Sequence, residues 1–114
     1  MSTCLFCRIV AGEVPAEVVA RTPGTLAFRD VDPKAPVHVL VVPTAHVAHA
    51  AELGPEHGEM LAELFATARS VAEAEGVLEG GYRLVLNVGD DAGNTVAHLH
   101  LHVLGGRHLA WPPG

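Results

Sequence analysis

The clearest pattern in the sequence is His98-Leu99-His100-Leu101-His102-Val103-Leu104. Histidines and apolar residues alternate along it, and successive side chains of a β-strand point to opposite faces. We therefore expect a strand over residues 98–104 with Leu99, Leu101 and Val103 on its core side. The three histidines should share the opposite face, with alternate Cα atoms about 6 to 7 Å apart.

A long helix is predicted to cover the apolar side of that strand. Pro55, directly after Gly54, is well placed as a first helical residue, and apolar residues recur at three- and four-residue spacing up to Gly76. This apolar stripe consists of Met60, Leu61, Leu64, Phe65, Ala68, Val71 and Ala72. Most glutamates of the segment fall off the stripe and are expected on a solvated face: Glu56, Glu59, Glu63, Glu73 and Glu75.

Four more strands are predicted from short apolar runs at residues 16–20, 25–29, 38–43 and 82–88. The turn Thr22-Pro23-Gly24-Thr25 joins the first two as a hairpin. Pairing the strands in chain order gives an antiparallel five-stranded meander with one long helix packed on one face, which is an α+β fold. Because no repeat or linker interrupts the chain, residues 1–114 are expected to form a single domain.

Composition excludes several kinds of partner. The 114 residues include 7 Lys+Arg and 13 Asp+Glu, for a formal net charge of −6. Since no basic cluster is present, we expect neither nucleic acid nor an anionic membrane surface as the main partner. No run approaches the ~18 apolar residues of a membrane helix, and no secretory signal opens the sequence, so a soluble cytoplasmic protein is expected. Reduced Cys4 and Cys7 are then metal ligands or plain small residues rather than a disulfide.

Three imidazoles on one strand face indicate a functional site, because packing them together costs desolvation and mutual repulsion that Thr or Val would avoid. Two chemistries fit: a three-histidine zinc site with an open position for water, or nucleophilic attack by a neutral imidazole on phosphorus. The loop at residues 89–95 is rich in Gly, Asp and Asn and carries Thr95. Its backbone N–H groups and hydroxyl favour phosphate chemistry, although an ordinary turn has a similar composition.

The alternating strand resembles the signature of the histidine triad (HIT) family, which is His, apolar, His, apolar, His, apolar, apolar. Further segments resemble the family in the right order, namely the opening from Cys4 to Pro15 and residues 28–38. The ending, Gly105-Gly106-Arg107 with Trp111-Pro-Pro-Gly, resembles that of the Hint branch. The resemblance covers essentially the whole chain. It implies a HIT-like fold, a homodimer, and a purine nucleoside phosphoramidase that acts through a covalent nucleotidyl-histidine without a catalytic metal.

The resemblance also implies roles for individual residues. His100 would be the nucleophile, His102 would contact the phosphate and take part in proton transfer, and Thr95 would touch the leaving group. His38 would lie behind the histidines as a support. The resemblance further implies contacts with a purine nucleotide of the AMP or GMP type for Asp30, Val31, Asn87, Gly93, Asn94 and Trp111. Asp30 would bind the ribose hydroxyls and Val31 would lie beside the base. Trp111 would lie on a tail that reaches toward the partner's site.

A structural zinc site is implied as well. Cys4, Cys7, His46 and His98 match the ligand positions of family members that bind zinc, a closed Cys₂His₂ set. The other interpretation is that the two cysteines are small buried residues and His46 is a surface histidine. Three histidines match nothing in the family and are expected on the surface: His49, His57 and His108.

One departure and several alternatives remain. Asn94 stands where the family commonly has Gln, which puts a side-chain contact there in doubt, while Thr95 keeps the hydroxyl. A dinucleoside polyphosphate hydrolase of the Fhit type would use the same histidines, but the Trp-Pro-Pro-Gly ending favours Hint. Leu99 argues against a uridylyltransferase, because those enzymes have proline at this position between the histidines. Two hypotheses come from other functional classes. One is a nucleotide-binding interaction module with incidental hydrolysis, and the other is a three-histidine zinc enzyme.

Overall fold

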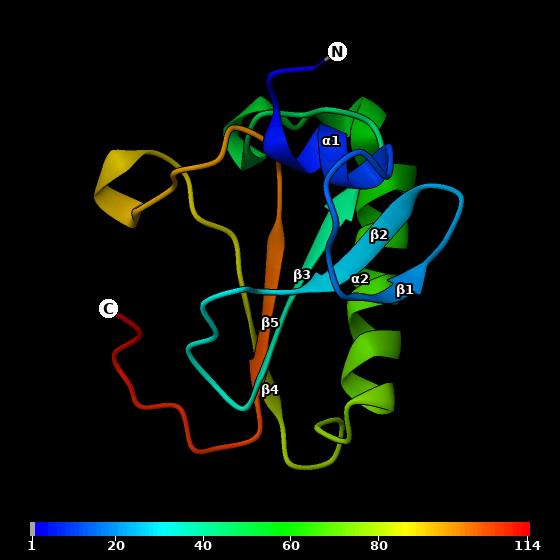
Figure 1. Cartoon of the computed structure of the whole chain (residues 1–114). Coiled ribbons are helices and arrows are strands. Elements are labelled where there is room, and N and C mark those ends of the chain that lie inside the picture. The colour runs from blue at the N-terminus through cyan, green and yellow to red at the C-terminus, as the bar shows by residue number, and fades with distance from the viewer. Residues whose placement is uncertain (1) are drawn as a thin grey trace.

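The structure, a computed structural model, describes residues 2–114 and contains one five-stranded antiparallel sheet and one long helix (Figure 1). The elements in chain order are α1 (Leu5–Val10), β1 (Val18–Arg21), β2 (Thr25–Arg29), β3 (Val37–Pro43), α2 (Gly58–Ala74), β4 (Tyr82–Val85) and β5 (Leu101–Gly105). Three short 3₁₀ turns lie at Ala50–Glu52, Pro55–His57 and Asp90–Ala92. The α+β class and the hairpin β1–β2 are as predicted. Within residues 2–114, no helix is both long and apolar enough to cross a bilayer.

The strand order is β1-β2-β3-β5-β4, so the predicted meander is wrong at its end. After β3 the chain crosses one face of the sheet through α2 and enters the sheet again at its edge as β4. It then returns as β5 into the gap between β3 and β4, pairing antiparallel with both. A turn signal identifies strands that are joined by a tight hairpin, but the place where a strand lands after a helical crossover depends on the packing of that helix.

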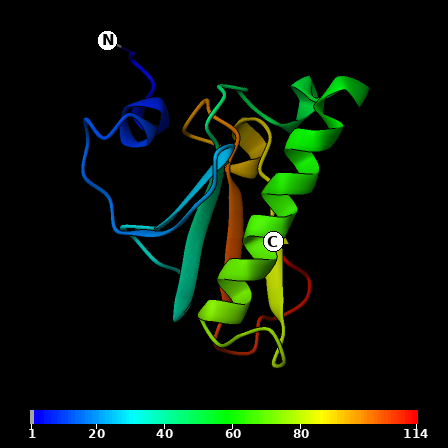
Figure 2. The same cartoon turned by 90° about the vertical axis from the view of Figure 1, so that its right-hand side faces the viewer.

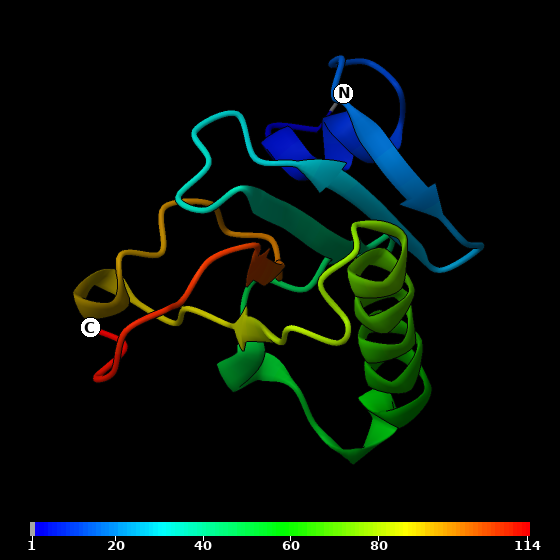
Figure 3. The ribbon, with the colours of Figure 1, turned by 90° about the horizontal axis from the view of Figure 1, so that it is seen from below.

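The two helices lie on opposite faces of the sheet. Figure 2 shows α2 along one face and the short α1 on the other, and Figure 3 shows the C-terminal tail leading away from α2. The face under α2 is the larger core. Leu99, Leu101 and Val103 are buried there, as predicted, together with alternate valines of β3 and the apolar stripe of α2.

The regular strand β5 begins at Leu101, three residues later than predicted. Before that point the chain contacts the end of β3 and the loop that follows it: Leu99 N donates to Val47 O at 2.6 Å, and the His98 ring bonds to Pro43 O at 2.9 Å. Leu99 is nevertheless buried on the α2 side. The alternation therefore holds for the apolar residues, although the regular ladder starts only after the first two histidines.

Helix α2 deviates from its predicted stripe at one position. Phe65 is 43% exposed, whereas Thr67 is buried and its Oγ1 lies 2.8 Å from Thr25 Oγ1. The hairpin turn sits over this part of the helix, and a polar pair closes the contact there. An apolar periodicity identifies the buried face but does not detect a buried threonine that has found a partner.

Two of the five glutamates expected in solvent hold the hairpin to α2. Glu63 accepts hydrogen bonds from Thr22 Oγ1 and from Gly24 N, the latter at 3.0 Å. Glu75 forms a bidentate pair with Arg29, with Nη2 to Oε2 at 3.1 Å. The guanidinium carries a raised pKa because of its hydrogen bonds to Glu75 and Glu17. The prediction that these glutamates are merely solvated is therefore wrong for Glu63 and Glu75.

Helix α1 was not predicted. Its six residues are too few to show a helical period, and its N-cap is Cys4, whose sulfur accepts from Cys7 N at 3.3 Å. Phe6 and Ile9 of α1 pack with apolar side chains of β2 and β3 in a second cluster, which also contains Leu26, Phe28, Leu40 and Val42. This cluster covers only part of the sheet face, and the space left open beside it is the candidate site.

Candidate functional site

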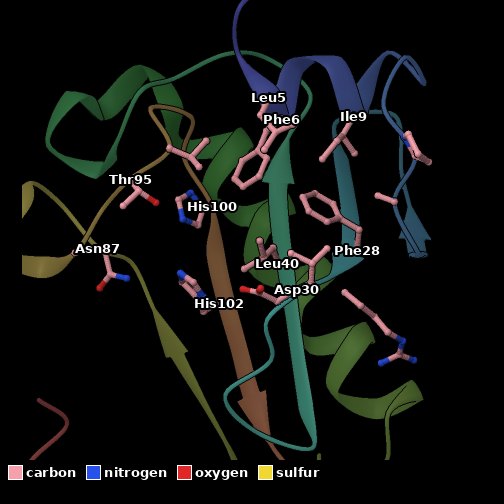
Figure 4. A pocket seen from close by; sticks show the side chains of 16 residues that line it. Leu5, Phe6, Ile9, Phe28, Asp30, Leu40, Asn87, Thr95, His100 and His102 are labelled. Carbon is pink, nitrogen blue, oxygen red and sulfur yellow. The ribbon is translucent and has the colours of Figure 1, made fainter.

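A cavity of about 330 Å³ lies on the α1 face of the sheet, bordered by α1, β2, β3, the residues leading into β5 and the loop after β4 (Figure 4). One part of its wall is apolar and comes from α1 and the adjoining strands: Leu5, Phe6, Ile9, Phe28 and Leu40. The other part is polar: Asp30, Asn87, Thr95, His100 and His102. A concave apolar site with a few convergent polar groups is typical of small-molecule binding.

The ring of His100 is held in one orientation. Its Nδ1 lies 2.7 Å from the backbone oxygen of His98, and because a carbonyl can only accept, Nδ1 carries the hydrogen. The ring of Phe6 packs edge-on against it with centroids 5.1 Å apart. In the neutral ring, Nε2 is then the unprotonated nitrogen. His100 thus offers an oriented lone pair at the wall of the cavity.

A chain of hydrogen bonds fixes the tautomer of His102. The backbone N–H of Lys34 donates to His38 Nδ1 at 3.0 Å, so the hydrogen of a neutral His38 lies on Nε2. That nitrogen is 2.9 Å from His102 Nδ1 and donates to it. His102 consequently carries its hydrogen on Nε2, which is buried and has no partner among residues 2–114. His102 therefore holds a donor ready for an acceptor in the cavity.

Burial keeps the imidazoles of His38 and His102 neutral. Desolvation, reinforced by the neighbouring His100 and His38, lowers the pKa of His102 to about 4. Burial also lowers the pKa of His38, against the opposing effect of Asp30, whose Oδ2 lies 3.4 Å from His38 Nε2. At neutral pH, His102 therefore acts as a neutral hydrogen-bond donor rather than as a cation.

The loop after β4 closes on itself and presents Gly93 to the cavity. Gly89 and Gly93 have φ of 80° and 79°, a region that favours glycine, and Asn94 N bonds back to Gly89 O at 3.1 Å. Gly93 and Thr95 line the cavity, whereas the Asn94 side chain does not. The Oδ1 of Asn94 is buried without a partner among the described residues. The Asn94 side chain thus lies outside the cavity lining, in line with the doubt about a side-chain contact with the nucleotide at this position.

Most of the predicted site residues come together. Those that line the cavity are Asp30, Val31, Asn87, Gly93, Thr95, His100 and His102. His38 lies behind them, as expected for a support. Trp111 does not reach the cavity of its own chain: it is 80% exposed on the C-terminal tail. The apolar wall from α1 was not predicted, because the six residues of α1 are too few to show a helical period.

Charge around the cavity is unusual for a site that would hold a highly anionic ligand. Arg29 is the one Lys or Arg side chain lining it among the described residues. Its Nε is 2.7 Å from Glu17 and its terminal nitrogens hold Glu75. The cationic side chain is thus already neutralised by two carboxylates, so an anion bound in this cavity would have to rely on neutral N–H donors.

The predicted zinc ligands form a second cluster. His46 Nδ1 and His98 Nδ1 lie 3.2 Å apart, Cys4 Sγ is 3.3 Å from His98 Nδ1, and Cys7 Sγ is 3.3 Å from His46 Nδ1. In a tetrahedral site with Zn–N of about 2.0 Å and Zn–S of about 2.3 Å, neighbouring ligand atoms are roughly 3.3 to 3.7 Å apart. The bond from His98 Nε2 to Pro43 O leaves Nδ1 free for a metal. The four side chains fit a closed structural zinc site.

A three-histidine metal site fits the geometry poorly. His98 points its free nitrogen at the two cysteines, and His100 gives its Nδ1 to a backbone carbonyl. Asp30, His38 and His102 do lie close together, but the nitrogens of His38 are occupied by Lys34 N and His102 Nδ1. The histidines of the strand thus serve different partners instead of converging on one ion.

Comparisons with known proteins agree with this architecture. Residues 11–109 match the HIT domain family. An uncharacterised HIT-like protein of Synechococcus elongatus is 49% identical over 110 residues, 96% of each chain. The crystal structure of a HIT family hydrolase from Legionella pneumophila is similar at TM-score 0.96 and 48% identity, over 98% of this chain and 100% of the other. A histidine triad nucleotide-binding protein from Candida albicans is similar at TM-score 0.83 and 27% identity, over 96% and 83%. With a family match over most of its length and near-half identity to relatives of the same size, the chain belongs to the HIT, or histidine triad, family.

Proposed function

We propose that this protein hydrolyses the P–N bond of purine nucleoside phosphoramidates, such as adenosine 5′-monophosphoramidate, through a nucleotidyl-histidine at His100. One observation carries the proposal: the His98 carbonyl holds Nδ1–H of His100, so that the Nε2 lone pair belongs to a side chain that lines the cavity. A neutral imidazole with one nitrogen committed to a carbonyl is a competent nucleophile at neutral pH.

The reaction proceeds in two displacements at phosphorus. In the first, Nε2 of His100 bonds to phosphorus while the P–N bond of the substrate breaks. The leaving nitrogen takes up one proton from solvent, passed on by the Thr95 hydroxyl, and departs as the free amine. In the second, water attacks phosphorus, the bond to His100 breaks, and the water proton returns to solvent. The sum is phosphoramidate plus water giving nucleoside monophosphate plus amine.

Neutral donors stabilise the phosphoryl oxygens. His102 Nε2–H has no partner among the described residues and supplies one donor, and the side-chain amide of Asn87 borders the same region and supplies another. Asp30 is assigned to the ribose hydroxyls, because its carboxylate accepts hydrogen bonds and borders the apolar part of the cavity where a purine fits. Val31 lies beside that base position. None of these steps requires a metal, and the zinc implied at the Cys₂His₂ cluster would be structural.

The cavity is less suited to binding a dinucleoside polyphosphate than a substrate with one phosphoryl group. A chain of several phosphates carries charges that proteins commonly meet with Arg and Lys. The single arginine at the cavity is already engaged by Glu17 and Glu75. The cavity therefore favours a substrate with one phosphoryl group, in agreement with the expectation from the Hint-like ending.

We also assign the protein to the Hint branch as a homodimer. The tail follows β5 and is held at Arg83, whose Nη2 donates to the carbonyls of Leu109 and Ala110 at 3.3 and 3.1 Å. Beyond these contacts Trp111 is exposed, which suits a side chain that completes the site of a second copy. Light scattering should give a dimer mass, and a monomer mass at micromolar concentration would contradict the assignment.

The decisive assay uses a fluorogenic adenosine phosphoramidate in EDTA, with the zinc content of untreated protein measured in parallel. We expect release of AMP by the parent and its loss in His100→Ala. Quenching the parent in acid-free denaturant during turnover should trap one nucleotidyl group per chain, detected as a mass increase that is absent from the variant. A folded parent that binds AMP but releases none from the phosphoramidate would refute the proposal.

A further inference from the structure

Resting on the proposed function for the nucleotide site, we infer that Cys4 and Cys7 are a redox-sensitive pair. An oxidant of the peroxide class converts the two thiols into an intrachain disulfide, and this modification weakens nucleotide binding. The pair acts through α1, because Cys4 is the N-cap of this helix, Cys7 lies within it, and the same helix forms the apolar wall of the cavity.

The two thiols are placed so that they can join without a rearrangement of the backbone. Both are free, and both side chains are only partly buried. Cys7 lies three residues after Cys4, and its backbone N–H donates to Cys4 Sγ at 3.3 Å. Cα atoms three residues apart in a helix are separated by about 5 Å, which lies within the range that disulfides span. Rotation about the side-chain bonds therefore suffices to bring the sulfurs together.

Oxidation by hydrogen peroxide balances with no other reactant. One thiol is oxidised to a sulfenic acid, while peroxide is reduced and its second oxygen leaves as water. The other thiol attacks the oxidised sulfur, the S–O bond breaks, and a second water departs as the S–S bond forms. Two thiols and one peroxide thus give one disulfide and two waters. Cys4 borders a hollow of about 380 Å³, which has room for a molecule as small as peroxide.

In the reduced protein the two sulfurs connect α1 to the rest of the fold. Cys4 Sγ lies 3.3 Å from His98 Nδ1, and Cys7 Sγ lies 3.3 Å from His46 Nδ1. His46 belongs to the loop after β3, and His98 precedes β5. The four side chains also fit zinc, which would bind both sulfurs as thiolates. A disulfide has neither an S–H group nor a thiolate, so oxidation releases this end of α1 from both histidines.

The shape of the cavity depends on where α1 lies. Leu5, Phe6 and Ile9 of the helix line the cavity. The ring of Phe6 packs edge-on against the rings of His100 and Phe28, with centroids 5.1 and 5.4 Å away. A helix of six residues is not stable alone, so its contacts with the rest of the protein set its position. Once its first turn is released, the apolar wall packs less closely on a bound nucleoside.

The test compares the reduced full-length protein, with its zinc content measured, with the same protein after treatment with hydrogen peroxide in EDTA. The mass of the treated chain should fall by two hydrogens. Calorimetry should show AMP binding about fivefold more weakly, because part of an apolar contact is lost. Amides of α1 should exchange hydrogen about tenfold faster, whereas exchange in α2 should be unchanged. Dithiothreitol followed by zinc should reverse these changes, which methionine sulfoxide would not allow.

Two single variants serve as controls, and either one suffices if the other does not fold. Cys7→Ser and Cys4→Ser each remove one partner of the disulfide. Serine is a favourable N-cap residue, so Cys4→Ser keeps the start of α1. Neither variant should lose two hydrogens in peroxide, and the AMP affinity of each should be the same before and after treatment.

An intrachain disulfide that leaves either AMP affinity or the exchange of α1 unchanged overturns this inference and leaves the proposed function standing. So does peroxide that oxidises the thiols further without joining them. A parent that shows all the expected changes but hydrolyses no phosphoramidate refutes the proposed function and supports this inference. A folded parent that binds no AMP in either state contradicts both.

Discussion

On the α2 face of the sheet, β3 and β5 present only apolar side chains that are almost wholly buried, whereas on the α1 face the same strands present Leu40 and His102 to a cavity, with His38 behind them. Residues one position apart in the sequence thus face opposite requirements. Side chains on the α2 face must be apolar and fill the core, whereas side chains on the α1 face must place particular atoms at particular positions. Since alternation separates the two, stability and chemistry should respond to different substitutions along one strand.

The largest expected effect is on the cavity face. His100→Ala should lower kcat/KM for an adenosine phosphoramidate at least about 1000-fold, because it removes the proposed nucleophile. The free energy of unfolding should change by no more than about 1 kcal/mol, since this side chain is only partly buried. Steady-state kinetics and urea unfolding measure the two quantities. Residual activity within tenfold of the parent would mean that another group attacks phosphorus.

The neighbouring residue should behave in the opposite way. Leu101→Ala removes a side chain that is buried under α2 and should cost about 3 kcal/mol of stability through lost apolar contact and a cavity. The folded fraction should keep its KM for the phosphoramidate. A loss of activity larger than the loss of folded protein would show that the two faces are coupled.

The metal cluster is connected to the catalytic side of the strand through His98. His98 carries one ligand nitrogen, and its backbone oxygen holds His100. Zinc at 100 to 1000 times its Kd should stabilise the parent by about 3 kcal/mol, and EDTA should remove this gain. Cys7→Ser should be insensitive to both in thermal unfolding. An equal response of parent and Cys7→Ser would place zinc binding elsewhere.

Acid should reveal the buried imidazole. The folded pKa of His102 is about 4, against about 6.5 in the unfolded chain, so the unfolded state binds the extra proton between these values. The stability that this group contributes is fully present above pH 6.5 and is lost as the pH falls toward 4. His102→Gln should therefore lose about 2 kcal/mol less than the parent between pH 6.5 and 4.5, measured by urea unfolding at constant zinc. His108→Gln, at an exposed position, should follow the parent.

The smallest effect concerns the hairpin. Glu75→Gln should reduce stability by about 0.5 to 1 kcal/mol, because the half-buried pair with Arg29 loses its charge. Glu73→Gln, whose partner Arg69 is an exposed neighbour at 3.5 Å, should change stability by less than about 0.5 kcal/mol. Equal effects in thermal unfolding would contradict a structural role for Glu75.

Local patterns in the sequence account for much of this fold. Alternation in residues 98–104 correctly separates the apolar from the histidine side, and helical spacing identifies the buried face of α2 apart from Phe65. Order in the sheet was not accessible, because no local pattern states that β5 enters between β3 and β4. The pairing of Arg29 with Glu75 joins residues far apart in sequence, and such contacts exist only once the helix has packed.

The candidate site was likewise only partly predictable from the sequence. The histidines were identified by their spacing and Thr95 by the composition of its loop, whereas Asp30 and Asn87 were named only through the resemblance to a family. The apolar wall from α1 was not foreseen, since six residues carry no period. Asn94 and Trp111 were expected at the nucleotide and do not line the cavity of the single chain. A contact of Trp111 with a second copy would be a property of an assembly, which the structure of one chain does not express.

The backbone amide of Lys34 also bears on the design of inhibitors. An amide N–H can only donate, so the chain through His38 to His102 has one polarity and the neutral rings cannot exchange roles. Whatever occupies the place beside His102 Nε2 must accept a hydrogen bond. Compounds that offer an oxygen there, as a sulfonyl or carbonyl, suit this polarity. Compounds that offer an N–H there would set two donors against each other, and the protein has no tautomer with which to adapt.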